Sequence, residues 1–483
     1  MRINIVKILS KQVWDEILKK SKTTKVLVSV MFGLLMFSLI SGVNSYSFQK
    51  ETVEHYSHEV REKWENNPDK HPHRMAHYGY VALRHKYPLS FFDFGMESFI
   101  GNAIFLEAHK QNTTNFSEAS LSSSLLRFGE ISAAMVLQLL LPLLLFFWGF
   151  SLVAKERENG TLKMLSIQGI TWPEIIIGKS FGLLKMALIV FLPAYVLGLL
   201  IIAFSELADV KTDALIRYFL IGLAYTAYYL ICAMLAVLVS AKSATAKSSL
   251  TKLIGIWLIF TLVLPKMALI LGQYLYPSPS KMVFDMAVES EIIEQGDSHN
   301  PNDPHYAALK DSLLNAYNVS TVKELPFNYS GFMMKEGEKL SAVTHARHQS
   351  DLLDIYKDQQ DIVRYTALLN PYLAIKNLSM ALAGTDFITY TSFQNQAEEY
   401  RYNLAQKMND LQIELISNDV TSSSDKSAII SNNHWKEFPD FHYQFSDLKE
   451  AISAEIISIV SILLWLCALG FYVQNFTSKF KVI

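Results

Sequence analysis

The chain has 483 residues, of which 51% are hydrophobic and only 18% are charged, and its formal net charge at pH 7 is −2. This composition argues against a disordered chain, and the lack of a basic excess argues against a nucleic-acid-binding protein. The mean hydropathy of +0.19 is typical of a membrane protein that carries large soluble inserts.

The first 24 residues place apolar side chains at roughly helical spacing among lysines. We expect the segment 1–24 to form a cytoplasmic amphipathic helix, an elbow that lies at the membrane surface. The alternative is a solvated basic tail. No clear small-residue cleavage site follows, so a cleavable signal peptide is not predicted.

Apolar runs long enough to cross a bilayer occur six times. The expected spans are 25–45, about 131–154, 180–204, 218–240 and 253–275 within the region 131–275, and 453–473. We therefore predict a mostly α-helical, polytopic membrane protein with six transmembrane helices. The only cysteines, Cys232 and Cys467, lie inside these spans, so the parts outside the membrane must be stable without disulfides, as suits a bacterial periplasm.

Lysines indicate the orientation of the spans. They gather in the segments that six spans would place on one side, namely 1–24, the loop 155–179, the fourth-to-fifth connection and the tail 474–483. Because basic loops stay in the cytoplasm, both termini are predicted to be cytoplasmic. Two inserts, 46–130 and 276–452, would then be extracytoplasmic. We expect both to be largely helical and to pack against each other.

The loop 155–179, between the second and third spans, reads KERENGTLKMLSIQGITWPEIIIGK. Glu156 and Glu158 suit a helix start, and Gly160 permits a sharp turn. Leu162, Leu165 and Ile167 would offer an apolar edge to a partner, and Trp172 would begin the next helix at the membrane interface. The alternative is a solvated connector with no further role.

The first half of this loop resembles a family signature. It reads Glu-Arg-Glu-x-Gly-Thr-Leu-x-x-Leu, followed by Gly178-Lys179 at the head of the next span, and is similar to the E-R-E-x-G-T-L-x-x-L string of type-two ABC exporter permeases. In that family the segment contacts the cytoplasmic ATPase. The resemblance implies these ATPase-coupling residues: Glu156, Arg157, Glu158, Gly160, Thr161, Leu162 and Leu165.

The first insert is rich in histidine. Seven of the 13 histidines of the chain lie in it or at its borders: His55, His58, His71, His73, His77, His85 and His109. His73 and His77 are four residues apart, a spacing that metal-binding pairs on a helix use. However, no acid lies between them and no third ligand has a defined spacing. We therefore favour structural or incidental histidines over a metal site, and predict no metal and no cofactor.

Short motifs in both inserts also resemble a sub-family of these permeases that is known mainly as an uncharacterised domain family. In the first insert they are Ala76-His77-Tyr78-Gly79, Phe92-Asp93-Phe94-Gly95 and Leu106 to Asn112. In the second insert they include Leu325-Pro326-Phe327-Asn328 and Asn370-Pro371. Each motif is short, and their order along the chain gives them weight. Apolar periodicity also predicts helices over 340–369 and 388–416, with a stop at Asn370-Pro371.

The chain contains no phosphate-cradling Gly-x-x-x-x-Gly-Lys-Ser/Thr string and no hydrolase motif, so we expect a subunit that is not itself an enzyme. Lys266, after Pro265, lies well inside the fifth span. An ionisable group there is a candidate for the substrate pathway, and the alternative is a structural or snorkelling lysine. Pro265 is expected to kink its helix.

The leading hypothesis is a permease subunit of an ABC exporter in the bacterial inner membrane. The resemblance implies a cytoplasmic ATPase dimer, a second permease, identical or related, and the lipid bilayer as partners. An envelope partner for the inserts is an open possibility, and nucleic acid is not expected. The alternatives are a membrane sensor and a metal-handling protein that uses the histidine-rich insert.

Overall fold

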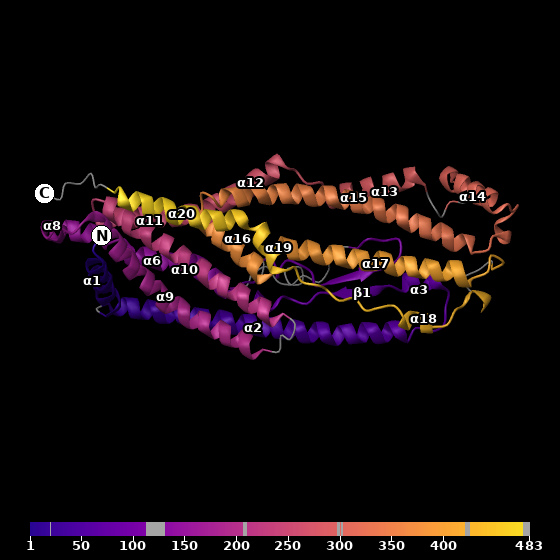
Figure 1. The fold of residues 1–483 in the computed structure, drawn as a ribbon, viewed down its shortest axis with the longest axis horizontal. Helices are drawn as coiled ribbons and strands as arrows, with labels where there is room; N and C mark the ends of the chain where they lie inside the picture. The colour runs from indigo at the N-terminus through magenta and orange to yellow at the C-terminus, as the bar shows by residue number, and fades with distance from the viewer. Residues whose placement is uncertain are drawn as a thin grey trace.

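The computed structural model describes residues 1–19, 21–112, 131–205, 210–296, 300, 303–420 and 426–476, and these are mostly α-helical. Figure 1 shows an elongated molecule. The N-terminus, α8 and the end of α20 lie at one end, and α3, α14 and α18 lie towards the other. We call the second end, beyond the apolar helices, the distal region.

Six helices among the described residues are long and apolar enough to cross a membrane, which confirms that part of the prediction. The first, third, fourth and sixth are α2 (Lys22–Glu65), α9 (Trp172–Phe204), α10 (Lys211–Lys242) and α20 (Ile456–Gln474). The second is built from α5 (Ala133–Met135), η4 (Val136–Leu140), α6 (Leu141–Gly149) and α7 (Ala154–Glu158). The fifth is built from α11 (Ala246–Leu258), η5 (Ile259–Val263) and α12 (Leu264–Leu275).

The second and fifth spans each contain a π-helical turn just before a proline. The turn η4 precedes Pro142, and η5 precedes Pro265. Proline lacks a backbone donor and its ring crowds the preceding turn, so carbonyls there lose their helical partners. Side chains from other helices take over: Tyr229 donates to the Leu137 carbonyl at 3.3 Å, and Asn370 donates to the Phe260 carbonyl at 2.8 Å. Two helix breaks are thus satisfied inside the protein.

The helix that contains the first span continues well beyond the predicted span 25–45. The helix α2 runs for 44 residues, which corresponds to roughly 66 Å at ~1.5 Å per residue. No proline interrupts the chain between Ser21, whose hydroxyl caps the helix, and Pro68. One continuous helix therefore connects the span to the distal region.

The second insert supplies most of the helices of the distal region. They are α13 (Lys281–Gln295), α14 (Pro304–Tyr317), η6 (Val322–Glu324), α15 (Tyr329–Thr366), α17 (Phe387–Leu415), η7 (Lys426–Ala428) and α18 (Asn433–Lys436). Helix α19 (Leu448–Ala454) packs on α16 and leads into α20. The helices predicted over 340–369 and 388–416 are confirmed by α15 and α17, although α15 begins eleven residues earlier than predicted. Asn328 and Asp386 cap these two helices through their side chains, which explains where each begins.

The first insert is less helical than predicted. It contains α3 (Pro72–Tyr78), β1 (Tyr80–Leu83), η2 (Pro88–Phe91) and β2 (Ala103–Leu106). The two strands pair antiparallel with Tyr80 opposite Leu106. Gly79 and Gly95 have positive φ angles, which break a helix, and proline begins η2. The expectation of a largely helical insert is therefore wrong for residues 79–112.

A short helix of the second insert lies among the spans. Helix α16 (Pro371–Ala383) packs between α10 and α20, and Figure 1 shows it beside them. It is apolar on nearly all sides, as helices in a protein interior are. With 13 residues it is about 20 Å long, too short to cross a ~30 Å apolar layer. The sequence had placed the whole region 276–452 in one insert outside the bundle, whereas helix α16 of that region packs among the spans.

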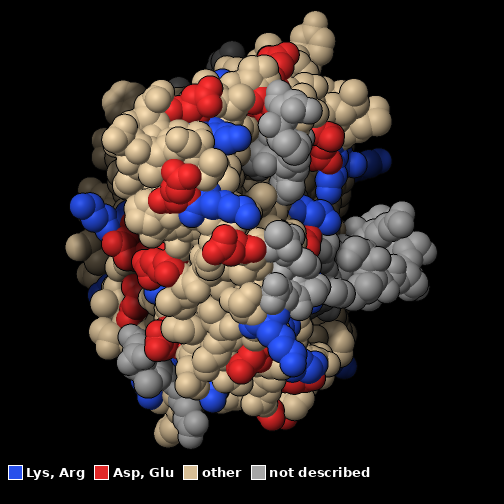
Figure 2. Space-filling model, turned by 90° about the vertical axis from the view of Figure 1, so that its right-hand side faces the viewer, with Lys and Arg blue, Asp and Glu red and all other residues tan. Residues whose placement is uncertain are grey.

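The two inserts share one hydrophobic core, which confirms that they pack against each other. Trp64 and Met75 from the first insert lie in it with Phe393 and Trp435 from the second. The indole nitrogen of Trp64 donates to the Trp435 carbonyl at 2.8 Å. On the distal face, acidic and basic side chains of the described residues are interspersed, as on water-exposed surfaces (Figure 2).

The N-terminal helix α1 (Ile3–Trp14) and the π-helical turn η1 (Asp15–Lys19) follow the amphipathic pattern that the sequence predicted. One side of α1, with Val6, Leu9 and Val13, is buried because α1 packs on α9, whereas Ile3 and Ile8 stay exposed. A Cβ atom added at Gly182 would lie only 2.6 Å from the Cβ of Val13. The close approach of the two helices therefore requires glycine at this position.

This contact predicts opposite effects for two glycine-to-alanine changes. Both Gly182 and Gly33 lie inside long helices, so alanine should add up to ~1 kcal/mol of helix propensity at either site. Gly182→Ala should nevertheless lower the melting temperature of the detergent-purified protein, because its Cβ collides with Val13. Gly33 has nothing within 4 Å and serves as the control. Equal melting temperatures for the two variants would contradict this packing.

Candidate functional site

The loop 155–179 folds into two short helical segments that carry on from the second span. Helix α7 ends at Glu158, and α8 covers Thr161–Ile167. Gly160, between them, has φ +75°, a conformation that glycine adopts at no steric cost. Figure 1 shows α8 at the extreme end of the molecule, beyond the spans. The sharp turn predicted at Gly160 is confirmed.

Glu156 points inward and joins the loop to the third span. Its Oε2 lies 2.7 Å from Nζ of Lys179, and that Nζ also donates to the Leu152 carbonyl at 2.7 Å. The side chain of Gln12, from α1, reaches the other carboxylate oxygen. Lys179 is fully buried, so its charge requires this carboxylate. The two separated parts of the signature, Glu156 and Gly178-Lys179, thus meet in space.

Arg157 and Glu158 hold the connection between the fourth and fifth spans. The guanidinium of Arg157 donates to the carbonyls of Ala241, at 2.6 Å, and Ser243, at the end of α10. A carboxylate oxygen of Glu158 accepts from the backbone nitrogen of Ala246 at 3.0 Å, at the start of α11. Each charge lies at the helix end whose dipole attracts it.

The remaining signature residues also stabilise the fold of the loop. The hydroxyl of Thr161 donates to the Glu156 carbonyl at 3.1 Å. Leu162 is only 2% exposed, and Leu165 is half-buried against the main core. The expected apolar edge is therefore wrong at Leu162, which faces the protein because it anchors α8.

The apolar surface that α8 does expose consists of Met164 and Ile167, which are 61% and 85% exposed. Ile167 belonged to the predicted edge, whereas Met164 did not. The two are three residues apart, a spacing that places side chains on one helix face, so periodicity could have found Met164. The signature residues thus hold α8 against the bundle, and Met164 and Ile167, which are not among the signature residues, form its exposed apolar surface.

A buried polar cluster connects the first insert to the spans. Ser379 on α16 donates to the Asp93 carboxylate and lies 3.2 Å from the Tyr225 hydroxyl of α10. That hydroxyl accepts from Gln138 of the second span at 2.7 Å. Asp93 belongs to the Phe92 to Gly95 motif, and nothing in the sequence indicated its partners. This cluster holds together the first insert, α16, α10 and the second span, which are far apart in sequence.

Lys266 does not join any of these clusters. It lies on the exposed face of α12, next to Met267, which is 60% exposed. Within the residue ranges that the structure describes, Lys266 makes no ion pair. Pro265 was expected to kink this helix. The structure has a π-helical turn, η5, just before Pro265.

The contacts of Arg157 predict that its loss would loosen the loop. Arg157→Met keeps an apolar stem but leaves the carbonyls of Ala241 and Ser243 without these donors, at a cost of about 1–3 kcal/mol. Backbone amides of 155–179 should then exchange hydrogen for deuterium roughly tenfold faster, as measured by mass spectrometry. Lys155→Met removes a neighbouring exposed charge and should leave the exchange unchanged. Identical exchange in both variants would refute the anchoring role of Arg157.

Comparison with known proteins gives one family match. Residues 281–444 match the family described as Domain of unknown function (DUF3526). No curated protein and no solved structure matches the chain. The matched region begins at α13 and includes α16, and it covers about a third of the chain. The second insert of this multi-span helical protein therefore contains a DUF3526 domain.

Proposed function

We propose that this protein is the permease subunit of an ABC exporter in the bacterial inner membrane. It would move a substrate outwards with energy from ATP hydrolysis by separate ATPase subunits. The observation that carries the proposal is the position of α8. A short helix with exposed Met164 and Ile167 projects beyond the spans, and the signature Glu156, Arg157 and Glu158 fasten its base to the bundle.

The anchors of the loop provide a route from an ATPase to the spans. A force on α8 would reach α9 through Glu156 and Lys179, α10 through Arg157, and the start of α11 through Glu158. Charge-assisted hydrogen bonds have defined geometry and hold such elements together as a unit. Three spans would therefore move when the loop is pushed.

Helix α10 would carry the movement to the other side of the membrane. Tyr225 of α10 meets Ser379 of α16, which binds Asp93 of the first insert. A shift of α10 would alter the packing of both inserts at this point. The inserts, which would lie outside the membrane, would then receive or release substrate in step with the ATPase.

The assembly would require a second permease, identical or related, and two ATPase subunits. Large apolar side chains exposed along α12 and α20, such as Leu269 and Leu463, suit contact with lipid or with that second permease. Lys266 lies on the same exposed side of α12 and is a candidate for the substrate pathway at the permease interface.

The exposed face of α8 predicts a coupling-defective variant. Ile167→Asp places a charge where an apolar contact with the ATPase would form, and should weaken the complex at least tenfold. ATP hydrolysis by the permease and its cognate ATPase, reconstituted together in nanodiscs, should fall accordingly. Val343→Asp, an equally drastic change at an exposed position of α15, is the control.

Both variants should elute as folded protein in size-exclusion chromatography, because both positions are exposed. Full assembly and hydrolysis with Ile167→Asp would mean that α8 is not the ATPase contact.

The proposed orientation predicts which residues an impermeant thiol reagent can reach. With exposed Cys467 replaced by alanine and buried Cys232 retained, Asn66→Cys and Glu414→Cys should be labelled in intact spheroplasts. Lys163→Cys on α8 should react only after lysis. The opposite pattern of labelling would invert the topology and remove the basis for a cytoplasmic α8.

A further inference from the structure

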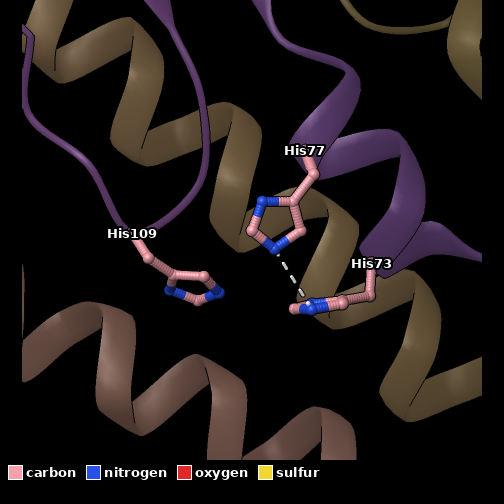
Figure 3. Close-up of side chains that lie close together, drawn as sticks. All are labelled: His73, His77 and His109. Carbon is pink, nitrogen blue, oxygen red and sulfur yellow. Dashed lines mark hydrogen bonds between the residues drawn. The ribbon is translucent and has the colours of Figure 1, made fainter.

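Three histidine side chains of the first insert converge on one point of the distal region (Figure 3). His73 and His77 come from α3, and His109 comes from the turn after β2. Their potential ligand atoms all lie within 4.8 Å of one another. The Nε2 atoms of His73 and His77 are 3.2 Å apart. The sequence had offered no third ligand for this pair, and the tertiary structure brings His109 to it.

Local structure explains why these rings meet. Residues four apart on α3 share one helix face, and the His71 side chain caps the helix by accepting from the backbone nitrogen of His73. The backbone nitrogen of Ala108 donates to the Ala76 carbonyl at 3.2 Å, which fixes the β2 turn against α3. His109 itself has φ +62°, an uncommon value for a residue with a side chain. The fold therefore maintains a strained backbone that presents this ring to the other two.

A carboxylate from the second insert orients His109. Oε2 of Glu338, on α15, lies 2.9 Å from Nδ1 of His109 and accepts from its backbone nitrogen at 3.0 Å. Oε1 of Glu338 pairs with Arg401 of α17 at 2.6 Å, and both side chains are fully buried. A carboxylate at Nδ1 favours the tautomer in which Nδ1 carries the proton and Nε2 carries a lone pair, as a metal ligand must. This carboxylate–histidine arrangement is the one that metal-binding histidines use.

We propose that His73, His77 and His109 bind a divalent transition-metal ion of the zinc class, with a fourth position open to water. Two nitrogens at ~2.05 Å from a tetrahedral ion lie about 3.3 Å apart, close to the His73–His77 distance. The three ligand atoms lie within 4.8 Å of one another, so a pair at that limit must approach by about 1.4 Å. His77 is exposed and its side chain can make that movement.

The chemistry of the ligands defines which ions fit. Imidazole nitrogens suit Zn²⁺, Cu²⁺ and Ni²⁺, whereas Mg²⁺ and Ca²⁺ require oxygen ligands. The site joins the two inserts, because two ligands lie on α3 and the third is held by Glu338 of α15. Bound metal would therefore stabilise the docking of the first insert on the second. This inference does not depend on the proposed transport function.

The test is a Zn²⁺ titration of the full-length chain in detergent, purified with an affinity tag that contains no histidine and stripped of metal. One equivalent of Zn²⁺ should bind and raise the melting temperature, and Mg²⁺ should do neither. Co²⁺ bound at the site should give the intense visible absorption of tetrahedral coordination. His77→Ala should weaken Zn²⁺ binding at least a hundredfold and should fold normally, since His77 is exposed.

The control is His58→Ala, which removes an exposed histidine of α2 and should bind Zn²⁺ as the unaltered chain does. Glu338→Gln tests the positioning role and should lower the affinity for Zn²⁺ by about 10- to 100-fold. Absence of stoichiometric Zn²⁺ binding by the unaltered chain would overturn the proposal. So would equal affinities for the His77→Ala and His58→Ala variants, because the three histidines would then have only a structural role.

Discussion

Every backbone polar group inside the apolar bundle needs a partner within the protein, and the arrangement of the spans depends on this constraint. Prolines in the second and fifth spans break the regular helical bonding. The carbonyls of Leu137 and Phe260 then accept from Tyr229 and Asn370. Asn370 is the N-cap residue of α16, so its bond to Phe260 holds the start of α16 against the fifth span. A helix of the second insert thereby becomes part of the packing of the spans.

The same helix links the bundle to the distal region. Ser379 on α16 meets Asp93 from the first insert and Tyr225 from the fourth span at one buried cluster. Buried polar groups are costly unless all of them are bonded, so such a cluster specifies one arrangement of its elements. At the C-terminal end of α10, Arg157 donates to the Ala241 carbonyl and holds the base of α8. One span thus contacts both the proposed ATPase-binding loop and the inserts.

The distal region is held together differently. It has no disulfides among the described residues, and a shared core of aromatic side chains joins the two inserts. The buried pair of Glu338 and Arg401 adds a charged connection that also orients His109. A buried pair of this kind is weak evidence for stability but fixes geometry, which a metal site requires. The proposed metal site lies where the two inserts meet.

The sequence by itself determined the six spans, the amphipathic N-terminal helix, the long helices α15 and α17 and the turn at Gly160. All of these depend on local properties, namely apolar length, periodicity and backbone freedom, which neighbouring residues reveal. The sequence also indicated that the loop 155–179 is special, but it assigned Leu162 to an exposed edge. Amphipathic spacing shows that a helix has an apolar face and does not show what covers it.

Only the tertiary structure decided the partners across long distances. It placed α16 among the spans, turned Glu156 towards Lys179 and brought His109 to His73 and His77. It also gave residues 79–112 of the first insert, which was expected to be largely helical, two paired strands and turns. Contacts between residues far apart in the chain arise from the packing of whole elements. No spacing along one sequence records them, because the intervening chain can close such distances in many ways.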